Sequence, residues 1–162
     1  MPEGPEAKIA SDYFNNFFKN SGNVKYELLT KYYENKYFDV FDTINNKKKH
    51  FSESFTIGKN IFINVNEDLI FNFHLGMTGG WSIDNIKHCH FKVKNRNKVL
   101  YFKDVRKFGK MKILTRTEFE KKFNPQIDIL NINYNKNIHL KFLKENIKTK
   151  KSVCSVIMDQ RF

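Results

Sequence analysis

Residues 69–80 read LIFNFHLGMTGG, and this stretch decides the kind of fold that the chain can adopt. In an extended strand, successive side chains point to opposite faces, so the apolar residues at positions 69, 71, 73 and 75 share one face, which is predicted to be core. The other face carries Asn72 and His74 together with Ile70. His74 is therefore expected on the non-core face, directly before a glycine-rich turn where backbone can approach a ligand closely.

Similar short runs of Phe, Ile, Val and Tyr continue from Val24 to about Thr115, separated by clusters of Asn, Asp, Gly and Lys. This pattern is typical of antiparallel strands, and so many strands favour a sandwich or a flattened barrel. Ahead of them, Pro5 to Lys19 is predicted to be an amphipathic helix. One side of that helix carries Ile9, Tyr13, Phe14, Phe17 and Phe18. The predicted strands are Val24–Thr30, Tyr37–Thr43, Asn60–Val65, Leu69–Leu75, Gly80–Ile83, Cys89–Lys94, Val99–Lys103 and Lys110–Leu114.

The pattern becomes helical after Thr117. A short helical turn is expected at Glu118–Phe123, and Asn124 and Pro125 end it. Residues 124–133 are interpreted as a linker, and a helix with exposed lysines is predicted from Tyr134 to about Asn146. A further helix is expected to begin near Ser152 and to remain incomplete at Phe162.

Composition indicates the kind of partner. The 162 residues carry a formal net charge of +12, and the excess of lysine is spread along the whole length. A polyanion is the partner that such a charge favours, with DNA or RNA ahead of a membrane surface. No apolar run is long enough to span a bilayer, and the first residues lack the pattern of a secretory signal. An intracellular location is expected, cytoplasmic or nuclear.

The cysteine count argues against a structural metal or a disulfide framework. Only Cys89 and Cys154 are present, too few for a zinc site built from cysteine alone. In the triplet His88, Cys89 and His90, strand alternation would point the two histidines to one face and the cysteine to the other. We therefore expect no cofactor and no zinc site within the chain.

The opening residues MPEGPE are the strongest chemical signal. If Met1 is removed, the new terminus is the secondary amine of Pro2, a nucleophile that can attack a sugar carbon and hold the product as an iminium. Glu3 is then close enough by covalent connection to donate or accept protons. The alternative is that the prolines and carboxylates simply begin a helix, since both suit its first turn.

With these opening residues and the motifs below, the chain resembles the formamidopyrimidine-DNA glycosylase and endonuclease VIII family of base-excision repair enzymes. The opening hexapeptide is like the form typical of the endonuclease VIII branch. Four further motifs follow in the family's order: the Gly58-Lys59 pair, HLGMTG at residues 74–79, DVRKFG at residues 104–109, and Asp159-Gln160. Each motif alone is weak, but the ordered set after an N-terminal Pro-Glu is highly specific.

The resemblance implies an α+β fold, with an N-terminal helix and a two-sheet antiparallel β-sandwich followed by the start of a helix-two-turns-helix module. The implied domains are a catalytic unit at residues 1–123, a linker at 124–133 and a partial DNA-binding module at 134–162. Complete members of the family continue with a finger. Two departures from the family pattern concern the second half. Cys154 stands where many members have a lysine, and the linker lacks the usual Gly-Pro before Asp128.

The resemblance also implies catalytic roles. Pro2 is expected to attack C1′ of the damaged nucleotide, and Glu3 to protonate the sugar oxygen. Lys59 is expected to contact the phosphate or the lesion, although an ordinary turn lysine after Gly58 is the simpler interpretation of the residue by itself. Supporting roles are expected for Glu6, His74 and Asp159.

A DNA-binding set is implied by the same motifs. Met77, Arg106 and Phe108 resemble the triad that fills the gap left by an extruded base, with Lys107 and Lys110 beside them. The alternative is that Met77 and Phe108 are core residues. Both lie next to glycines among basic residues, so exposure is predicted.

The expected function is a bifunctional DNA glycosylase and AP lyase that excises oxidised bases from damaged double-stranded DNA. The opening hexapeptide favours pyrimidines and hydantoins, whereas the complete triad keeps oxidised purines open. A monomer is expected. The competing hypothesis is a basic domain that only binds nucleic acid. A proline-dependent tautomerase is disfavoured by the helical pattern after Pro5.

Overall fold

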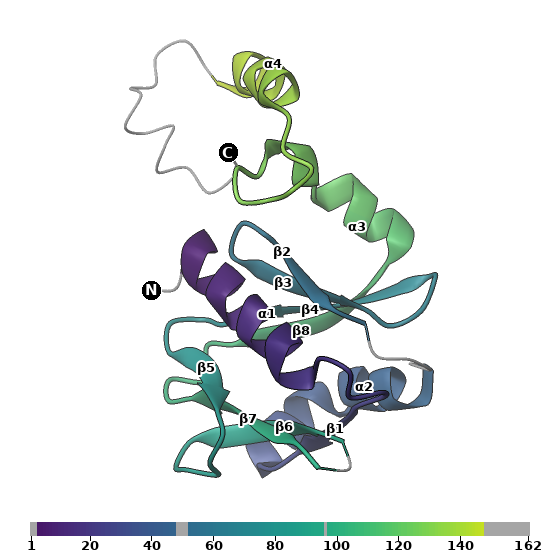
Figure 1. The fold of residues 1–162 in the computed structure, drawn as a ribbon, viewed down its shortest axis with the longest axis vertical. Coiled ribbons are helices and arrows are strands. Elements are labelled where there is room, and N and C mark those ends of the chain that lie inside the picture. The colour runs from purple at the N-terminus through teal and green to yellow at the C-terminus, as the bar shows by residue number, and fades with distance from the viewer. Residues whose placement is uncertain (1–2, 48–51, 96, 148–162) are drawn as a thin grey trace.

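The two sheets of the fold are both antiparallel and contain four strands each. The computed structural model describes residues 3–47, 52–95 and 97–147. One sheet has the strand order β1-β6-β7-β5 and the other the order β2-β3-β4-β8. They form the predicted β-sandwich with a helix before it (Figure 1). The elements are α1 (Gly4–Phe18), β1 (Lys25–Leu28), α2 (Lys31–Lys47), β2 (Ser54–Ile57), β3 (Asn60–Asn64), β4 (Leu69–His74), β5 (Gly79–Ser82), β6 (Cys89–Lys94), β7 (Val99–Asp104), β8 (Lys110–Thr115), α3 (Arg116–Lys122), the 3₁₀ turn η1 (Pro125–Ile127) and α4 (Lys136–Asn146).

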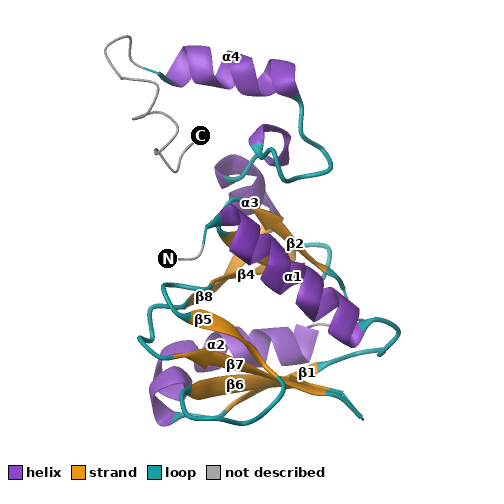
Figure 2. Ribbon diagram, turned by 60° about the vertical axis from the view of Figure 1, so that its left-hand side comes forward, coloured by secondary structure: helices purple, strands orange, loops and turns teal. Residues whose placement is uncertain are grey.

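Two helices close the two open sides of the sandwich. Helix α1 contacts β2 and β3 of one sheet and β5 of the other, whereas α2 contacts β1 and β8. Each helix therefore joins an edge strand of one sheet to an edge strand of the other, which covers edges that would otherwise be exposed. Figure 2 shows α1 crossing in front of the sheets, with α3 and α4 beyond the second sheet.

Aromatic side chains dominate the core. Between the sheets, Phe71 and Phe73 of β4 meet Phe91 and Phe102 of the other sheet, and all four are buried. Trp81 of β5 lies where the helix meets this core: its indole stacks on Phe14 of α1 with ring centroids 5.5 Å apart, and its Nε1 donates to the Ala10 carbonyl at 3.0 Å. These contacts fix α1, and with it the residues at its beginning, against the sandwich.

The second face of β4 is also buried, contrary to the expectation that it faces away from core. A separate cluster of Ile57, Phe62, Ile70, Leu114 and Phe119 lies on the outer side of the second sheet. Phe119 comes from α3, which folds back over that sheet. Only the end of the strand, at the half-buried His74, remains open on that face.

The predicted strand at Tyr37–Thr43 is wrong, because these residues belong to α2. The buried residues of α2 are Tyr33, Tyr37, Phe41 and Ile44, which recur at helical spacing, while Phe38 is exposed. Aromatic residues favour strands, and the helical period extends beyond the short window that was read as a strand.

Smaller differences concern strand and helix details. Strand β2 was not predicted, and its two polar residues, Ser54 and Thr56, are both buried. Ile9 and Tyr13 of α1 were predicted on its apolar side but are exposed. Cys89 and His90 are both buried. The register between β6 and β7 shifts at this point, and the His90 ring stacks on Tyr33 of α2 with centroids 4.4 Å apart.

Two further expectations concern membranes and the end of the chain. In the described ranges, no helix has the length and apolar character needed to cross a bilayer. Helix α4 confirms the predicted helix near residues 134–146, beginning two residues later. The helix expected from Ser152, with Cys154 and Asp159, lies outside the described residues.

Candidate functional site

The site begins at the first turn of α1. The Glu3 backbone N–H donates to Glu6 Oε2 at 2.9 Å, so a side chain three residues on satisfies a donor that the helix itself leaves free. This bond, together with the backbone N–H of Glu6 itself, lowers the pKa of the Glu6 carboxyl. Glu6 therefore organises the turn on which Glu3 stands. Pro2 lies outside the described residues.

Lys59 is brought to Glu3 by the turn between β2 and β3. Gly58 has a φ of +54°, which glycine adopts readily. The next residue directs its ammonium to Glu3, with Lys59 Nζ 2.6 Å from Glu3 Oε2. The Lys59 side chain is 13% exposed and that of Glu3 54%. The pair therefore has a sheltered cation and an open carboxylate.

His74 stands beside Lys59 through strand register. It pairs with Asn60 of β3 on one side and with Lys110 of β8 on the other. Burial lowers the pKa of His74, and the neighbouring charges of Lys59 and Lys110 lower it further. The Gly76 backbone N–H donates to His74 Nδ1 at 2.9 Å. In the neutral ring the proton is then on Nε2, which makes that nitrogen a donor.

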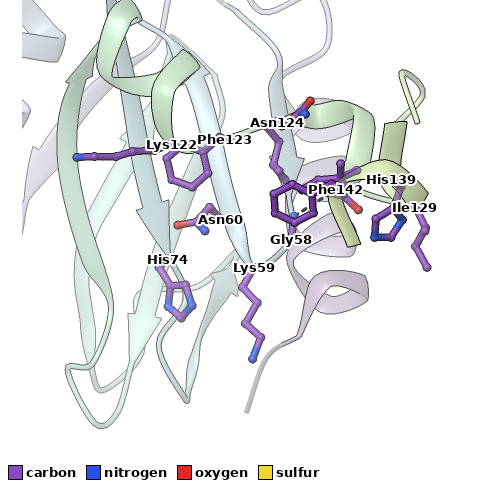
Figure 3. A pocket seen from close by; sticks show the side chains of 13 residues that line it. Gly58, Lys59, Asn60, His74, Lys122, Phe123, Asn124, Ile129, His139 and Phe142 are labelled. Carbon is purple, nitrogen blue, oxygen red and sulfur yellow. Dashed lines mark hydrogen bonds between the residues drawn. The ribbon is translucent and has the colours of Figure 1, made fainter. Parts of the chain in front are cut away.

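A cavity of about 690 Å³ opens beside these residues. Lys59, Asn60 and His74 contribute from the sandwich, as Figure 3 shows, and His139 and Phe142 from α4 on the opposite side. The cavity thus separates the sandwich from the helical region that follows it. Its remaining lining residues are Ile57, Gly58, Lys122, Phe123, Asn124, Ile127, Asp128 and Ile129.

The linker is attached to the turn that carries Lys59. The Gly58 N–H donates to Asp128 Oδ2 at 2.8 Å, and Asn131 Nδ2 donates to the Thr56 carbonyl at 3.1 Å. Sequence reasoning assigned no role to these two linker side chains. The signal available was the acidic residue in an otherwise amide-rich linker, but its partner is 70 residues away in the sequence and could not be inferred.

The three residues of the predicted gap-filling triad, Met77, Arg106 and Phe108, are called the wedge below, and they come together on the surface. Arg106 Nη1 lies 3.4 Å from Met77 Sδ. Met77 is 39% exposed and Phe108 53%, so the prediction that both are exposed is confirmed. A second cavity, of about 330 Å³, is lined by Met77, Phe108, His74 and Lys110 among others, and so connects the wedge to the histidine.

The two loops of the wedge approach each other at a glycine. Gly76 has a φ of +69°, and a Cβ built there would lie 2.5 Å from the Phe108 carbonyl carbon. No other residue fits this contact without moving backbone. Nearby, Lys107 lies over the Tyr32 ring of α2, 4.7 Å from its centroid, and Lys110 is exposed. The structure thus brings together the described residues of both predicted sets, whereas Pro2 and Asp159 lie outside the described range.

Solved structures share this fold. MutM in complex with DNA containing carbocyclic 8-oxo-G matches with a TM-score of 0.60 and 21% identity over 75% of this chain and 48% of that one. Lactococcus lactis Fpg (MutM) in complex with DNA containing an oxidised pyrimidine matches with a TM-score of 0.59 and 21% identity, over the same shares of the two chains. MutM (Fpg) from Thermus thermophilus gives 0.60 and 20%, over 74% of this chain and 43% of that one. The chain spans about half the length of these proteins.

The sandwich, its helices and the loops at residues 74–79 and 104–109 thus define a domain of the kind found in MutM proteins. Residues 1–111 match the formamidopyrimidine-DNA glycosylase N-terminal domain, and the chain belongs to that family. A search of curated protein sequences gives no match.

Proposed function

We propose that this chain supplies the catalytic part of a bifunctional DNA glycosylase and AP lyase that removes oxidised bases during base-excision repair. The observation that carries the proposal is the ion pair between Glu3 and Lys59, 2.6 Å long, at the N-terminus of α1 and beside the cavity. A carboxylate and an ammonium next to a terminal amine are the groups that this reaction needs. Membership of the glycosylase family supports the same reaction.

The proposed reaction starts at Pro2. Its amine attacks C1′ of the damaged nucleotide, the bond from C1′ to the base breaks, and the base leaves with the electron pair and with the proton that the amine loses. Glu3 then protonates the sugar ring oxygen, which opens the ring and gives an iminium on the proline nitrogen. Loss of a proton from C2′ expels the 3′ phosphate, and a second elimination expels the 5′ phosphate.

The geometry supports separate tasks for Lys59 and Glu3. Lys59 is nearly covered, so its charge acts in a sheltered environment where it stabilises an anion more strongly than in open water. Glu3 is more than half exposed, and its side chain also takes part in the capping box with Glu6 at the start of α1. A phosphate that approaches Lys59 can therefore replace Glu3 as its partner and release the carboxyl group for proton transfer.

Duplex DNA is the proposed partner. Extruding a base costs a few kcal/mol of lost stacking and pairing. The exposed Phe108 and Met77 are suited to replace part of the stacking, and the planar head of Arg106 to hydrogen-bond the orphaned base. The net charge of +12 supports binding to the phosphate backbone.

Trapping with borohydride tests the proposal. Incubation of the full chain with duplex DNA containing an abasic site, in the presence of borohydride, should reduce the iminium to a stable covalent adduct. Mass spectrometry should locate the adduct on Pro2 and show that Met1 is absent. A variant that retains Met1 is the control and should give no adduct. Binding to the same duplex without any adduct would instead favour a domain that only binds nucleic acid.

For the substrate, we propose oxidised pyrimidines and hydantoins, on the basis of the opening residues MPEGPE. This substrate preference is tested by measuring excision rates on matched duplexes that contain one oxidised pyrimidine, one hydantoin or one oxidised purine. Faster release of the oxidised purine would assign the chain to the other branch of substrates.

A further inference from the structure

The four residues Val105 to Phe108 are exposed, whereas the residues on either side of them, Asp104 and Gly109, are buried. If the exposed loop is to hold the Arg106 and Phe108 side chains in one arrangement, both of its ends must be fixed by contacts with the rest of the protein. Asp104 is the last residue of β7, and none of its surface is exposed. Its carboxylate turns inward, beneath the loop, where it meets three hydrogen-bond donors.

Each donor comes from a different part of the chain. Asp104 Oδ2 accepts from the Gly109 N–H at 2.7 Å and from the Tyr33 hydroxyl of α2 at 3.1 Å. Asp104 Oδ1 accepts from the Thr78 hydroxyl at 2.7 Å. All three donors are neutral, and burial raises the pKa of Tyr33, which therefore remains a donor. A buried carboxylate that is bonded in this way is held in one geometry.

Thr78 extends the network to the beginning of the loop. Its Oγ1 accepts from the Arg106 N–H at 3.1 Å while its hydroxyl proton is donated to Asp104. The segment from Arg106 to Phe108 is thus attached at its first residue through Thr78 and, just after its last, through Gly109. Thr78 also follows Met77 directly, so the same bonds fix the turn that carries the third wedge residue.

We propose that Asp104, acting through Thr78, is the positioning residue of the wedge: it joins the Met77 turn and the Arg106–Phe108 loop into one preformed unit before DNA binds. The proposal rests on the proposed function, because it requires that these side chains enter duplex DNA. Preformed loops lower the ordering cost of binding, so loss of the network should weaken binding where the wedge is used and nowhere else.

Thr78→Val is the test substitution, since it keeps the size of the side chain and removes the hydroxyl that both loops share. Tyr33→Phe is the matched control: it removes one hydrogen bond from the same carboxylate, and the described hydrogen bonds of the Tyr33 hydroxyl include none to either loop. The probe is a duplex with a non-cleavable tetrahydrofuran abasic site and 2-aminopurine opposite it, compared with the corresponding single strand.

Thr78→Val should weaken binding to the abasic duplex by roughly fivefold, the effect of about one hydrogen bond, and reduce the 2-aminopurine response. Binding to the single strand should stay as in the wild type. Thr78→Ser should restore both values, and Tyr33→Phe should leave both unchanged. In a Phe108→Ala background, Thr78→Val should have no further effect on the duplex.

The positioning role would be overturned if Thr78→Val and Tyr33→Phe lost the same amount of affinity for the abasic duplex. It would also be overturned if the 2-aminopurine response were unchanged in Thr78→Val. Failure of the proposed function gives a different result: the wild type itself would bind the abasic duplex no more tightly than an undamaged one. If Thr78→Val does not fold, Thr78→Ala in the same assay answers the same question.

Discussion

The two ends of the candidate site are built in opposite ways. At the catalytic end, Glu3 and Lys59 form an ion pair whose carboxylate is open to solvent. At the wedge end, exposed side chains stand on a buried carboxylate with three hydrogen bonds. A carboxylate that is open to solvent can exchange its partner, whereas a buried network with its hydrogen bonds satisfied is rigid. We therefore expect Glu3 and Lys59 to exchange partners when DNA binds, and the hydrogen bonds of Asp104 beneath the wedge to stay intact.

The largest effect is expected from substitutions at the catalytic end. Pro2→Gly should sharply reduce turnover. Glu3→Gln should slow base excision by roughly 10²- to 10⁴-fold, the range of general acid catalysis, and should impair β-elimination at a preformed abasic site less. Single-turnover rates on the two substrates measure the difference. The loss of stability should be small, since Glu3 is exposed and the amide oxygen of glutamine can still accept a hydrogen bond from Lys59. Equal slowing of both steps would remove the specific role of Glu3 in excision.

The second prediction compares one phenylalanine of the wedge with one of the core. Phe108→Ala should leave the melting temperature nearly unchanged and slow excision from duplex DNA much more than from single strands, where unstacking costs little. Arg106→Ala should behave in the same way. Phe102, which is fully buried, is the matched control, and Phe102→Ala should cost roughly 3 to 5 kcal/mol of stability. A large loss of stability in Phe108→Ala with an unchanged rate ratio would contradict the comparison.

A third prediction concerns charge around the wedge. Affinity for a non-cleavable abasic duplex should fall steeply as salt rises, because bound lysines release counterions from the phosphates. Lys107→Gln and Lys110→Gln should each reduce the slope of log affinity against log salt by about one. Lys94→Gln is the control, since Lys94, at the end of β6, is already paired with Glu27 of β1 at 2.6 Å. Affinity that does not depend on salt would argue against DNA as the partner.

The smallest effect is expected on folding stability when the pH is lowered. His90 lies beneath the wedge, with Nε2 2.8 Å from the Asp104 carbonyl and Nδ1 3.0 Å from Thr30 Oγ1. Burial lowers its pKa below the ordinary 6.5. The stability that depends on the neutral ring is complete above that ordinary value and is lost as pH falls toward the folded-state pKa, because only the unfolded chain takes up the proton.

Urea midpoints at pH 7.5 and 5.5 measure this dependence. The wild type should be less stable at the lower pH, and His90→Gln, though less stable overall, should lose less between the two. The pKa of His74 is also lowered, so a variant with both His74 and His90 replaced by Gln should lose the least stability between the two pH values. If His90→Gln loses as much as the wild type, the neutral ring does not contribute to the pH dependence.

Most of the sandwich could be predicted from residue patterns, because its strands are short apolar and aromatic runs separated by polar and glycine-containing turns. Helix α2 could not, since Tyr37 and Phe41 satisfy a strand period locally and a helical period only over a longer segment. The burial of Ile70 together with Phe119 could not be predicted either, because these residues are 49 positions apart in the sequence. Short-range patterns indicate the elements, but not which faces are covered.

The candidate site shows the same limit. Glu3, Lys59 and the wedge residues were named from motifs, and the structure brings the described ones into two neighbouring groups. Asp104 was part of a quoted motif, but nothing in the letters DVRKFG shows that its carboxylate lies below two loops. Asp128 was noted only as a place in the linker, and its bond to Gly58 depends on the folded chain.

Trp81 gives this molecule a built-in optical reporter. It is the one tryptophan of the chain, and its indole both stacks on Phe14 and donates to the Ala10 carbonyl. Its emission is therefore sensitive to whether α1 is seated on the sandwich. Since α1 begins directly after Glu3, unlabelled protein can signal in real time whether the reactive end is assembled, during refolding or as DNA arrives.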